Sequence, residues 1–133
     1  MNNKLKIVAQ KCLDGAYNNK MSFPEILKIL NENGFESYRV DYLQHCVSYY
    51  LTNGNGIDLP LPKHEASVAK IFDTTALQSA IKEAQQQLEG YTYKSFCEKV
   101  MNAGCAGYIV SFLGKRVLYF GRTAETHIEL FPQ

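Results

Sequence analysis

The sequence has no tryptophan and only four prolines, and it also has almost no net charge and no long apolar run. The last two absences exclude classes of location and partner. A transmembrane helix needs about 20 consecutive apolar residues, and no stretch approaches that length. The polar start, Met1 to Lys4, is not followed by the apolar region of a signal peptide, so we expect a cytosolic (cytoplasmic) protein. The formal net charge is +1 and the longest basic run is Lys115-Arg116, which argues against nucleic-acid binding. We therefore expect neither nucleic acid nor a membrane as a partner.

Motifs for metal binding and covalent catalysis are also missing. The four cysteines, Cys12, Cys46, Cys97 and Cys105, form no CxxC pair and have no histidine at the spacing of a zinc site. We expect them to be reduced, small apolar core residues, and we predict no metal site. No glycine-rich phosphate loop precedes a helix and no GxSxG elbow occurs, so the sequence predicts no cofactor.

What the chain does have is an internal similarity between residues 22–50 and residues 92–120. Identical residues at an offset of 70 are Gly34/Gly104, Tyr38/Tyr108, Val40/Val110, Leu43/Leu113, Val47/Val117 and Tyr49/Tyr119. Such a repeat predicts two copies of one supersecondary unit. The 133 residues fit one domain, and half of them would be marginally stable alone. We therefore predict a single domain, 1–133, whose two pseudo-symmetric halves share a core.

Each half is predicted to begin with two helices. Apolar residues at helical intervals indicate a first helix at about 3–16, and its counterpart begins after Asp73, a residue type that caps helices. The second helix begins after Ser22 in one half and after Thr92 in the other. Glu25 stands three places after Ser22, which predicts a capping box at this helix.

Three strands are predicted to follow in each half. Gly34 and Gly104 mark the end of the preceding helix, because a left-handed residue commonly closes a helix. The predicted strands are 38–43, 47–51 and 57–59 in the first half, and 108–113, 117–121 and 128–130 in the second. The third strands of the two halves, 57–59 and 128–130, match at an offset of 71. The predicted fold class is α+β: internally duplicated ααβββ units, with an antiparallel sheet of up to six strands and four main helices. The halves are about 1–62 and 73–133, with a linker at 63–72.

Histidines beside carboxylates are the candidate site residues. His64 precedes Glu65, and His127 lies between Glu125 and Glu129. Side chains alternate along a strand, so the last three would share a face, where a histidine could act as a base or a weak metal ligand. A solvated loop and an exposed strand face would explain the same residues without any chemistry. The candidate ligand-binding residues, near a seam between the halves, are His64, Glu65, Arg122, Glu125 and His127.

An apolar sheet face in the second half is the candidate interface. Ile109, Leu113, Leu118 and Phe120 would cluster opposite the core, where the first half has polar residues. An apolar face in one half alone indicates a covering element or a partner subunit. Two alternatives stay open: a homodimer through this face, for which about 800 Å² buried per subunit is typical, or residues 57–72 folding back over it.

Four segments carry a resemblance to a known family. They read GFESYRVD at 34–41, LPLPKHEA at 59–66, AGCAGYIV at 103–110 and YFGRTAETH at 119–127. Over nearly its whole length the chain resembles the YbcV-like proteins, a bacterial family of unknown function whose members often carry the label "phage envelope protein". The resemblance implies a prophage-associated genomic context. It implies no activity, cofactor or catalytic residue.

The sequence therefore leaves two main classes of function. The first is an uncharacterised binding or interaction module, homo-oligomeric and without an established catalytic activity. The alternative is a small-molecule-binding protein or enzyme that uses His64, His127 and nearby carboxylates at the seam, with an unknown ligand. A third reading, a phage structural component, requires assembly into large particles.

Overall fold

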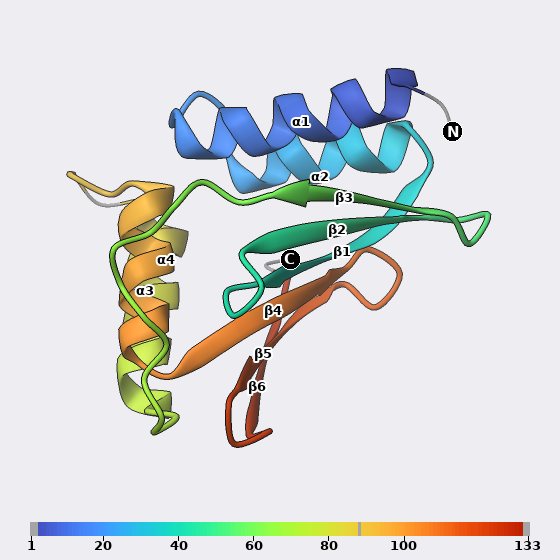
Figure 1. Ribbon diagram of the computed structural model, residues 1–133. Helices are drawn as coiled ribbons and strands as arrows, with labels where there is room; N and C mark the ends of the chain where they lie inside the picture. Colours follow the sequence, from blue (N-terminus) through green and yellow to red (C-terminus); the bar gives the residue numbers. More distant parts are fainter. Residues whose placement is uncertain (1–2, 88, 132–133) are drawn as a thin grey trace.

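The computed structural model describes residues 3–87 and 89–131 of the chain. The elements are α1 (Asn3–Tyr17), α2 (Phe23–Glu32), β1 (Phe35–Asp41), β2 (Cys46–Leu51), β3 (Gly56–Pro60), α3 (Thr74–Gln86), α4 (Tyr93–Asn102), β4 (Cys105–Ser111), β5 (Arg116–Gly121) and β6 (Thr126–Leu130). Within this described part, four helices accompany one six-stranded antiparallel sheet (Figure 1). The predicted α+β fold class is confirmed.

The sheet has the strand order β3-β2-β1-β4-β5-β6, so the two halves meet where β1 pairs with β4. The central register is Tyr38 opposite Val110, Arg39 opposite Ile109 and Val40 opposite Tyr108. This register is unchanged when the halves are exchanged at an offset of 70 residues. The bounds of α4, β4, β5 and β6 also lie 70 residues after those of α2, β1, β2 and β3. A common origin of the halves by duplication stays a prediction.

Side-chain caps begin α2, α3 and α4 at the predicted residues. The Ser22 hydroxyl accepts the Glu25 N–H and the Glu25 carboxylate accepts the Ser22 N–H, which completes the capping box. Asp73 and Thr92 each accept a first-turn N–H of the helix that follows. These caps stabilise helix ends that would otherwise leave N–H groups without partners. No helix in the described part of the chain is long and apolar enough to cross a membrane.

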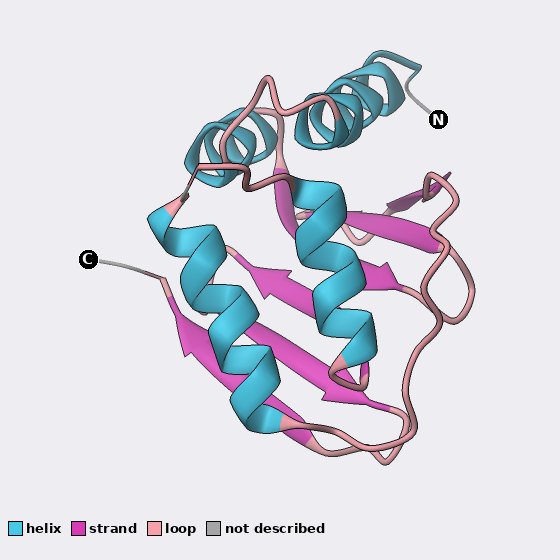
Figure 2. Cartoon of the chain, turned by 90° about the vertical axis from the view of Figure 1, so that its left-hand side faces the viewer, coloured by secondary structure: helices cyan, strands magenta, loops and turns pink. Residues whose placement is uncertain are grey.

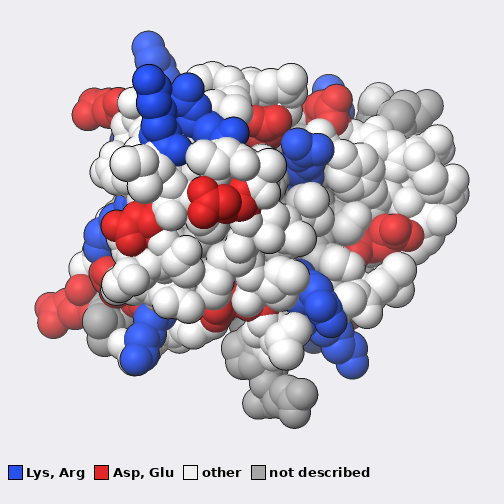
Figure 3. Space-filling model, turned by 90° about the horizontal axis from the view of Figure 1, so that it is seen from below, with Lys and Arg blue, Asp and Glu red and all other residues white. Residues whose placement is uncertain are grey.

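Alternating side chains divide the sheet into a covered and an uncovered face. Tyr38 and Val40 of β1 are buried, whereas Arg39 between them is exposed. Helices α1 and α2 lie above β1, β2 and β3 in Figure 1, and α3 and α4 lie in front of the strands in Figure 2. The helices thus cover one face, and the core lies between them and the sheet. The view from below shows acidic and basic side chains interspersed among uncharged ones (Figure 3).

Residues 61–73 connect the halves along the side of α4. The Ala69 N–H donates a 3.0 Å hydrogen bond to the carbonyl of Met101 in the last turn of that helix. Figure 1 shows the segment passing beside α4 and α3, while β3 is itself part of the sheet. The alternative in which residues 57–72 fold back over the uncovered face is therefore wrong.

The third strands correspond at an offset of 70 rather than the predicted 71. Ile57 of β3 corresponds to His127 of β6, because both pair with the equivalent tyrosine of the neighbouring strand. A one-residue shift in register exchanges the two faces of a strand. Ile57 is accordingly 5% exposed and Ile128 is 45% exposed. The correction turns His127 and Glu129 toward the covered face.

The strands of the first hairpin of each half also end earlier than predicted. β4 stops at Ser111, so Leu113 lies in the β4–β5 turn, where it is 77% exposed. Leu113 was predicted on the apolar sheet face, and this placement is wrong. The reason is a longer turn, in which Lys115 takes a left-handed φ of 50°, as His45 does (56°) in the equivalent turn.

Gly34 and Gly104 end α2 and α4 with φ values of +88° and +91°, as predicted. A Cβ atom on Gly34 would meet no atom within 4 Å, whereas on Gly104 it would lie 2.0 Å from the Ile71 carbonyl oxygen. The left-handed conformation alone costs an L-residue about 1–2 kcal/mol. We expect Gly34→Ala to lower the free energy of unfolding by about that amount, and Gly104→Ala to lower it by clearly more. Urea unfolding of both variants tests this, and equal losses would contradict it.

Candidate functional site

A cavity of about 870 Å³ lies on the covered face of the sheet. It is lined by residues of α1, α2, α3, the start of α4 and strands β1, β2, β4, β5 and β6. Helix α1 packs against α4, and the exchange of halves makes α3 and α2 the equivalent pair. At this second pair, residues of α2 (Phe23, Ile26) and of α3 (Ile81, Ala84) line the cavity. One of the two equivalent helix seams is therefore packed, and the other borders the cavity.

Four tyrosines form a row across the floor of the cavity: Tyr49 of β2, Tyr38 of β1, Tyr108 of β4 and Tyr119 of β5. The ring centroids of Tyr49 and Tyr38 lie 5.5 Å apart, those of Tyr38 and Tyr108 6.4 Å apart, and those of Tyr108 and Tyr119 5.5 Å apart. Two of the pairs lie directly opposite each other on neighbouring strands, where aromatic side chains stabilise a sheet. The tyrosine row thus follows the central register of the sheet.

Three hydroxyl groups of this row have no hydrogen-bond partner. Tyr108 shares a hydrogen bond with the Tyr93 hydroxyl, whereas those of Tyr38, Tyr49 and Tyr119 bond to no residue in the described part of the chain. The three side chains belong to residues that are only 7%, 3% and 6% exposed. Burial raises the pKa of all three, so each hydroxyl stays neutral and can both donate and accept. In the described part of the chain, the buried side-chain atoms without a partner are the Tyr42 hydroxyl and His64 Nδ1. The hydroxyls of Tyr38, Tyr49 and Tyr119 are instead accessible from the cavity, where they can bond to a molecule that enters it.

The rim of the cavity is formed where the two helix–helix loops meet. Asn19 of the first loop accepts the Tyr93 N–H at the start of α4, with an N···O distance of 3.3 Å. Phe23 and Phe131 meet edge to face with ring centroids 5.9 Å apart. Lys20, like Asn19, lines the cavity from the exposed first loop. The cavity therefore has an aromatic floor and a rim of both polar and aromatic side chains.

A histidine–carboxylate pair stands at the β6 side of the cavity. His127 Nε2 lies 2.6 Å from Glu129 Oε2, and Glu129 lines the cavity. Their side chains are 14% and 30% exposed. The predicted third member, Glu125, lies in the turn before β6, where its carboxylate accepts a hydrogen bond from Thr123. The structure thus brings together His127 and Glu129 but leaves Glu125 exposed.

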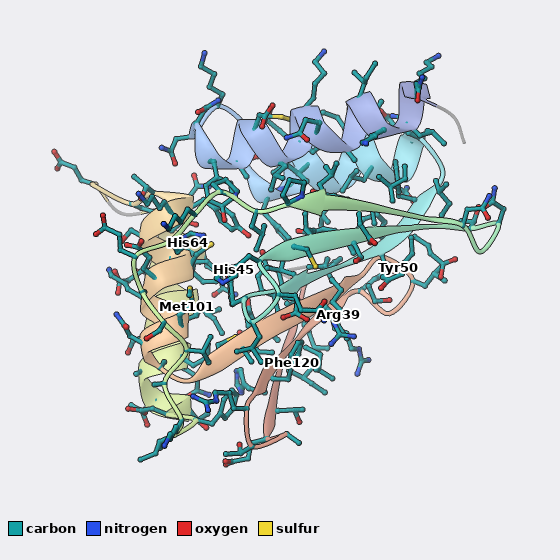
Figure 4. The ribbon with its side chains drawn as sticks, in the orientation of Figure 1. Arg39, His45, Tyr50, His64, Met101 and Phe120 are labelled. Atoms are coloured by element: carbon teal, nitrogen blue, oxygen red, sulfur yellow. The ribbon has the colours of Figure 1, made fainter. Side chains whose placement is uncertain are left out.

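His64 belongs to a separate, buried cluster between α1 and α4. His64 Nε2 shares a 2.8 Å hydrogen bond with the Tyr17 hydroxyl, and Nδ1 faces Glu98 Oε2 at 3.6 Å (Figure 4). The residue is 6% exposed, although a solvated loop was the alternative reading. Burial lowers the pKa of His64, and Glu98 partly opposes this effect. A neutral ring suits the site, because Nε2 can then accept from Tyr17 while Nδ1–H points toward Glu98.

The predicted site residues therefore do not form one site. The partners of His64 are on α1 and α4, whereas those of His127 are on β5 and β6. Glu65 is exposed, and Arg122 donates to the Val68 carbonyl (3.3 Å), which ties the connecting segment to the end of β5. Among the residues that the structure describes, no group of three histidine, cysteine or acidic side chains could hold a metal ion.

The cysteines are poor nucleophiles in this fold. Burial raises the pKa of Cys97 to about 11, and the Tyr17 hydroxyl lies 3.8 Å from its sulfur. Burial likewise raises the pKa of Cys12 to about 11 and of Cys105 to about 12. The thiolate is the reactive form, and all three thiols stay protonated near neutral pH. Their roles are those of small core residues.

The uncovered face carries most of the predicted interface residues. Ile109, Leu118 and Phe120 are half-buried there, and the Arg39 guanidinium lies 5.2 Å from the centre of the Phe120 ring (Figure 4). The exposed residues Ile128 (45%) and Leu130 (63%) extend this surface along β6. The predicted offset of 71 left these two residues out of the candidate interface, because it aligned them with Ile57 and Leu59, which are buried.

The cavity and its tyrosine row were not predicted as a site. The signal was present, since Tyr38/Tyr108 and Tyr49/Tyr119 are identities of the repeat, but packing of the core explained them equally well. The sequence pattern does not specify where the helices lie over the sheet. Because the cavity depends on the placement of the helices, only the structure reveals the cavity.

Acidification should weaken the protein through His64. Its pKa in the folded protein lies below the ordinary value of 6.5, so the folded state favours the neutral ring. The neutral His64 ring therefore adds to the free energy of unfolding. The full amount is present at pH values above 6.5, and it is lost as the pH falls through the lowered pKa of the folded protein. Between about pH 7.5 and 5.5, we expect the wild type to lose more free energy of unfolding than His64→Gln. Glu98, Lys94 and His45 are common to both proteins, and equal losses would contradict the prediction.

Comparison with known proteins identifies the family of the chain. Residues 11–129 match the family model described as "Protein of unknown function (DUF1398)", which spans everything from the middle of α1 to β6. A search of the curated proteins finds no match. The chain belongs to this family of unknown function, and a YbcV-like or prophage association stays a prediction.

Proposed function

We propose that the protein is a binding module for a small organic molecule that lies on the tyrosine row. The observation that carries this proposal is a large cavity that is lined by three tyrosines whose accessible hydroxyls have no protein partner in the described part of the chain. Each feature alone has a simpler explanation. A cavity can hold water, and a lone tyrosine hydroxyl can bond to that water, but three such hydroxyls on one mainly apolar lining favour a ligand with polar groups on an apolar body.

The size and lining of the cavity support this function. Ligand pockets usually measure about 300–1,000 Å³ and are lined by apolar and aromatic side chains with a few polar groups. The cavity of about 870 Å³ lies within that range, and its lining includes Tyr91, Phe96 and Phe131 beside the tyrosine row. Tyrosine hydroxyls favour a molecule with carbonyl, ether or hydroxyl oxygens on a mainly apolar body.

The three hydroxyls are accessible from the cavity, so water can complete their hydrogen bonds when no ligand is present. An apolar ligand body that also supplies acceptors would satisfy the hydroxyls and bury the surrounding rings. We therefore expect ligand binding to raise the stability of the protein.

Nile red, a neutral fluorescent molecule with an apolar ring body, is a suitable probe. We expect it to bind the wild type, and Ala84→Phe to weaken binding at least about tenfold, because the new ring fills space between α3 and the tyrosine row. The matched control is Ala76→Phe, which adds the same ring on the exposed side of α3. Fluorescence titration measures the dissociation constants. Equal weakening by both variants, or no binding to the wild type, would contradict the proposal.

A second candidate function is self-association through the uncovered face. A second copy of the chain is the proposed occupant, since most homo-oligomers are twofold dimers that use one self-complementary patch. Ile109, Leu118 and Phe120 with the exposed Ile128 and Leu130 supply an apolar strip on one half of the sheet only. This strip favours a dimer over a monomer that exposes it.

Light scattering tests the self-association. We expect a dimer for the wild type and a monomer for Ile128→Glu, because a buried charge without a partner disfavours the interface. Tyr50→Glu is the control on the same face of the first half, where Tyr50 is 39% exposed, and it should remain dimeric. A monomeric wild type at concentrations of about 100 μM would contradict the candidate.

A further inference from the structure

The two halves differ at the edge of the cavity. On β3 the residues that face the helices are Ile57 and Leu59, which are 5% and 2% exposed. The register places His127 and Glu129 at the equivalent positions of β6. The inner faces share the pairs Tyr38/Tyr108, Val40/Val110, Val47/Val117 and Tyr49/Tyr119, and beside them a histidine–carboxylate pair replaces two aliphatic side chains. This is a local departure from symmetry at the cavity, and it is a departure in charge.

The pair is an expensive feature for stability alone. A partly buried ion pair gives little net stabilisation, because both groups lose water, and apolar residues at the same positions usually serve as well. The first half illustrates this with Ile57 and Leu59. A histidine–carboxylate pair at this edge is better explained by what it offers the cavity. Glu129 lines the cavity, and only Oε2 of its carboxylate is engaged by His127.

The remaining carboxylate oxygen is the recognition element. Glu129 Oε1 makes no hydrogen bond within the described ranges, and a carboxylate can accept several hydrogen bonds. Three charged residues line the cavity among those described: Lys20, Glu25 and Glu129, which leaves one net negative charge. Lys20 and Glu25 are exposed and the Glu25 carboxylate caps α2, whereas Glu129 is half-buried on β6, the strand that pairs with β5 of the aromatic floor.

We propose that the ligand of the cavity is an organic cation: a protonated amine on an aromatic or alicyclic body. This inference rests on the proposed binding function. The ammonium group would donate to Glu129, which His127 holds in place, and the body would lie on the tyrosine row. The aromatic floor favours the same sign of charge, because the faces of aromatic rings attract cations. Both features disfavour a carboxylate or phosphate ligand of equal size.

Three probes that share one naphthalene ring test the charge preference. They are 1-naphthylmethylamine, which is an ammonium ion at neutral pH, the neutral alcohol 1-naphthalenemethanol, and 1-naphthaleneacetate, which is a carboxylate. Calorimetric titration of the wild type should give the order amine, alcohol, carboxylate, with the amine bound about tenfold more tightly than the alcohol. Glu129→Gln should bring the amine and alcohol to nearly equal affinity while the alcohol affinity stays unchanged.

Two further variants make the assignment specific. Glu25→Gln removes the other lining carboxylate and can keep the capping box, so the amine preference should persist. His127→Gln removes the partner of Glu129, and the preference should also persist, which keeps the test informative if Glu129→Gln fails to fold. Equal binding of all three probes to the wild type, or preference for the carboxylate, overturns the cation assignment but leaves the binding function standing. Absence of binding by all three overturns both.

Discussion

Strands β1 and β4 pair antiparallel at the centre of the sheet, and this pairing fixes where the other elements of both halves can lie. Arg39 faces Ile109 at its midpoint, with equivalent residues at equal distances on either side. Because the register is symmetric, Tyr38 and Tyr108 come within 6.4 Å of each other, and their cross-strand partners Tyr49 and Tyr119 extend the row outward. A shift of one residue in this register would turn one half of the row to the uncovered face.

The two helix layers complete this frame in unequal ways. Between α1 and α4, the rings of Tyr17 and Tyr93 meet edge to face, and His64 closes the seam through its hydrogen bond to Tyr17. The segment that carries His64 connects the two halves and bonds to the end of α4. At the equivalent seam, residues of α2 and α3 border the cavity instead. A nearly symmetric sheet therefore supports an asymmetric helix layer, and the candidate site occupies the open side of that layer.

The sequence was informative where the physical signal is local. Caps at Ser22, Asp73 and Thr92 predicted the helix starts, and the repeat predicted the succession of two helices and three strands in each half. It failed where the outcome depends on register or on packing between distant elements. Ile57 and Ile128 look alike but face opposite sides, because strand pairing rather than residue similarity decides the face. The burial of His64 and the cavity above the tyrosines depend on how the helices sit, which no local pattern encodes.

High-resolution crystallographic density from protein purified without added ligand decides whether the tyrosine row is the floor of a binding site. We expect ordered density above Tyr38, Tyr49 and Tyr119, from a bound molecule or a water cluster within hydrogen-bond distance of the three hydroxyls. The contrary result would be α2 and α3 closed together over the sheet, with the hydroxyls paired to protein groups and no cavity between them. In that case the tyrosine row would be an ordinary part of the core.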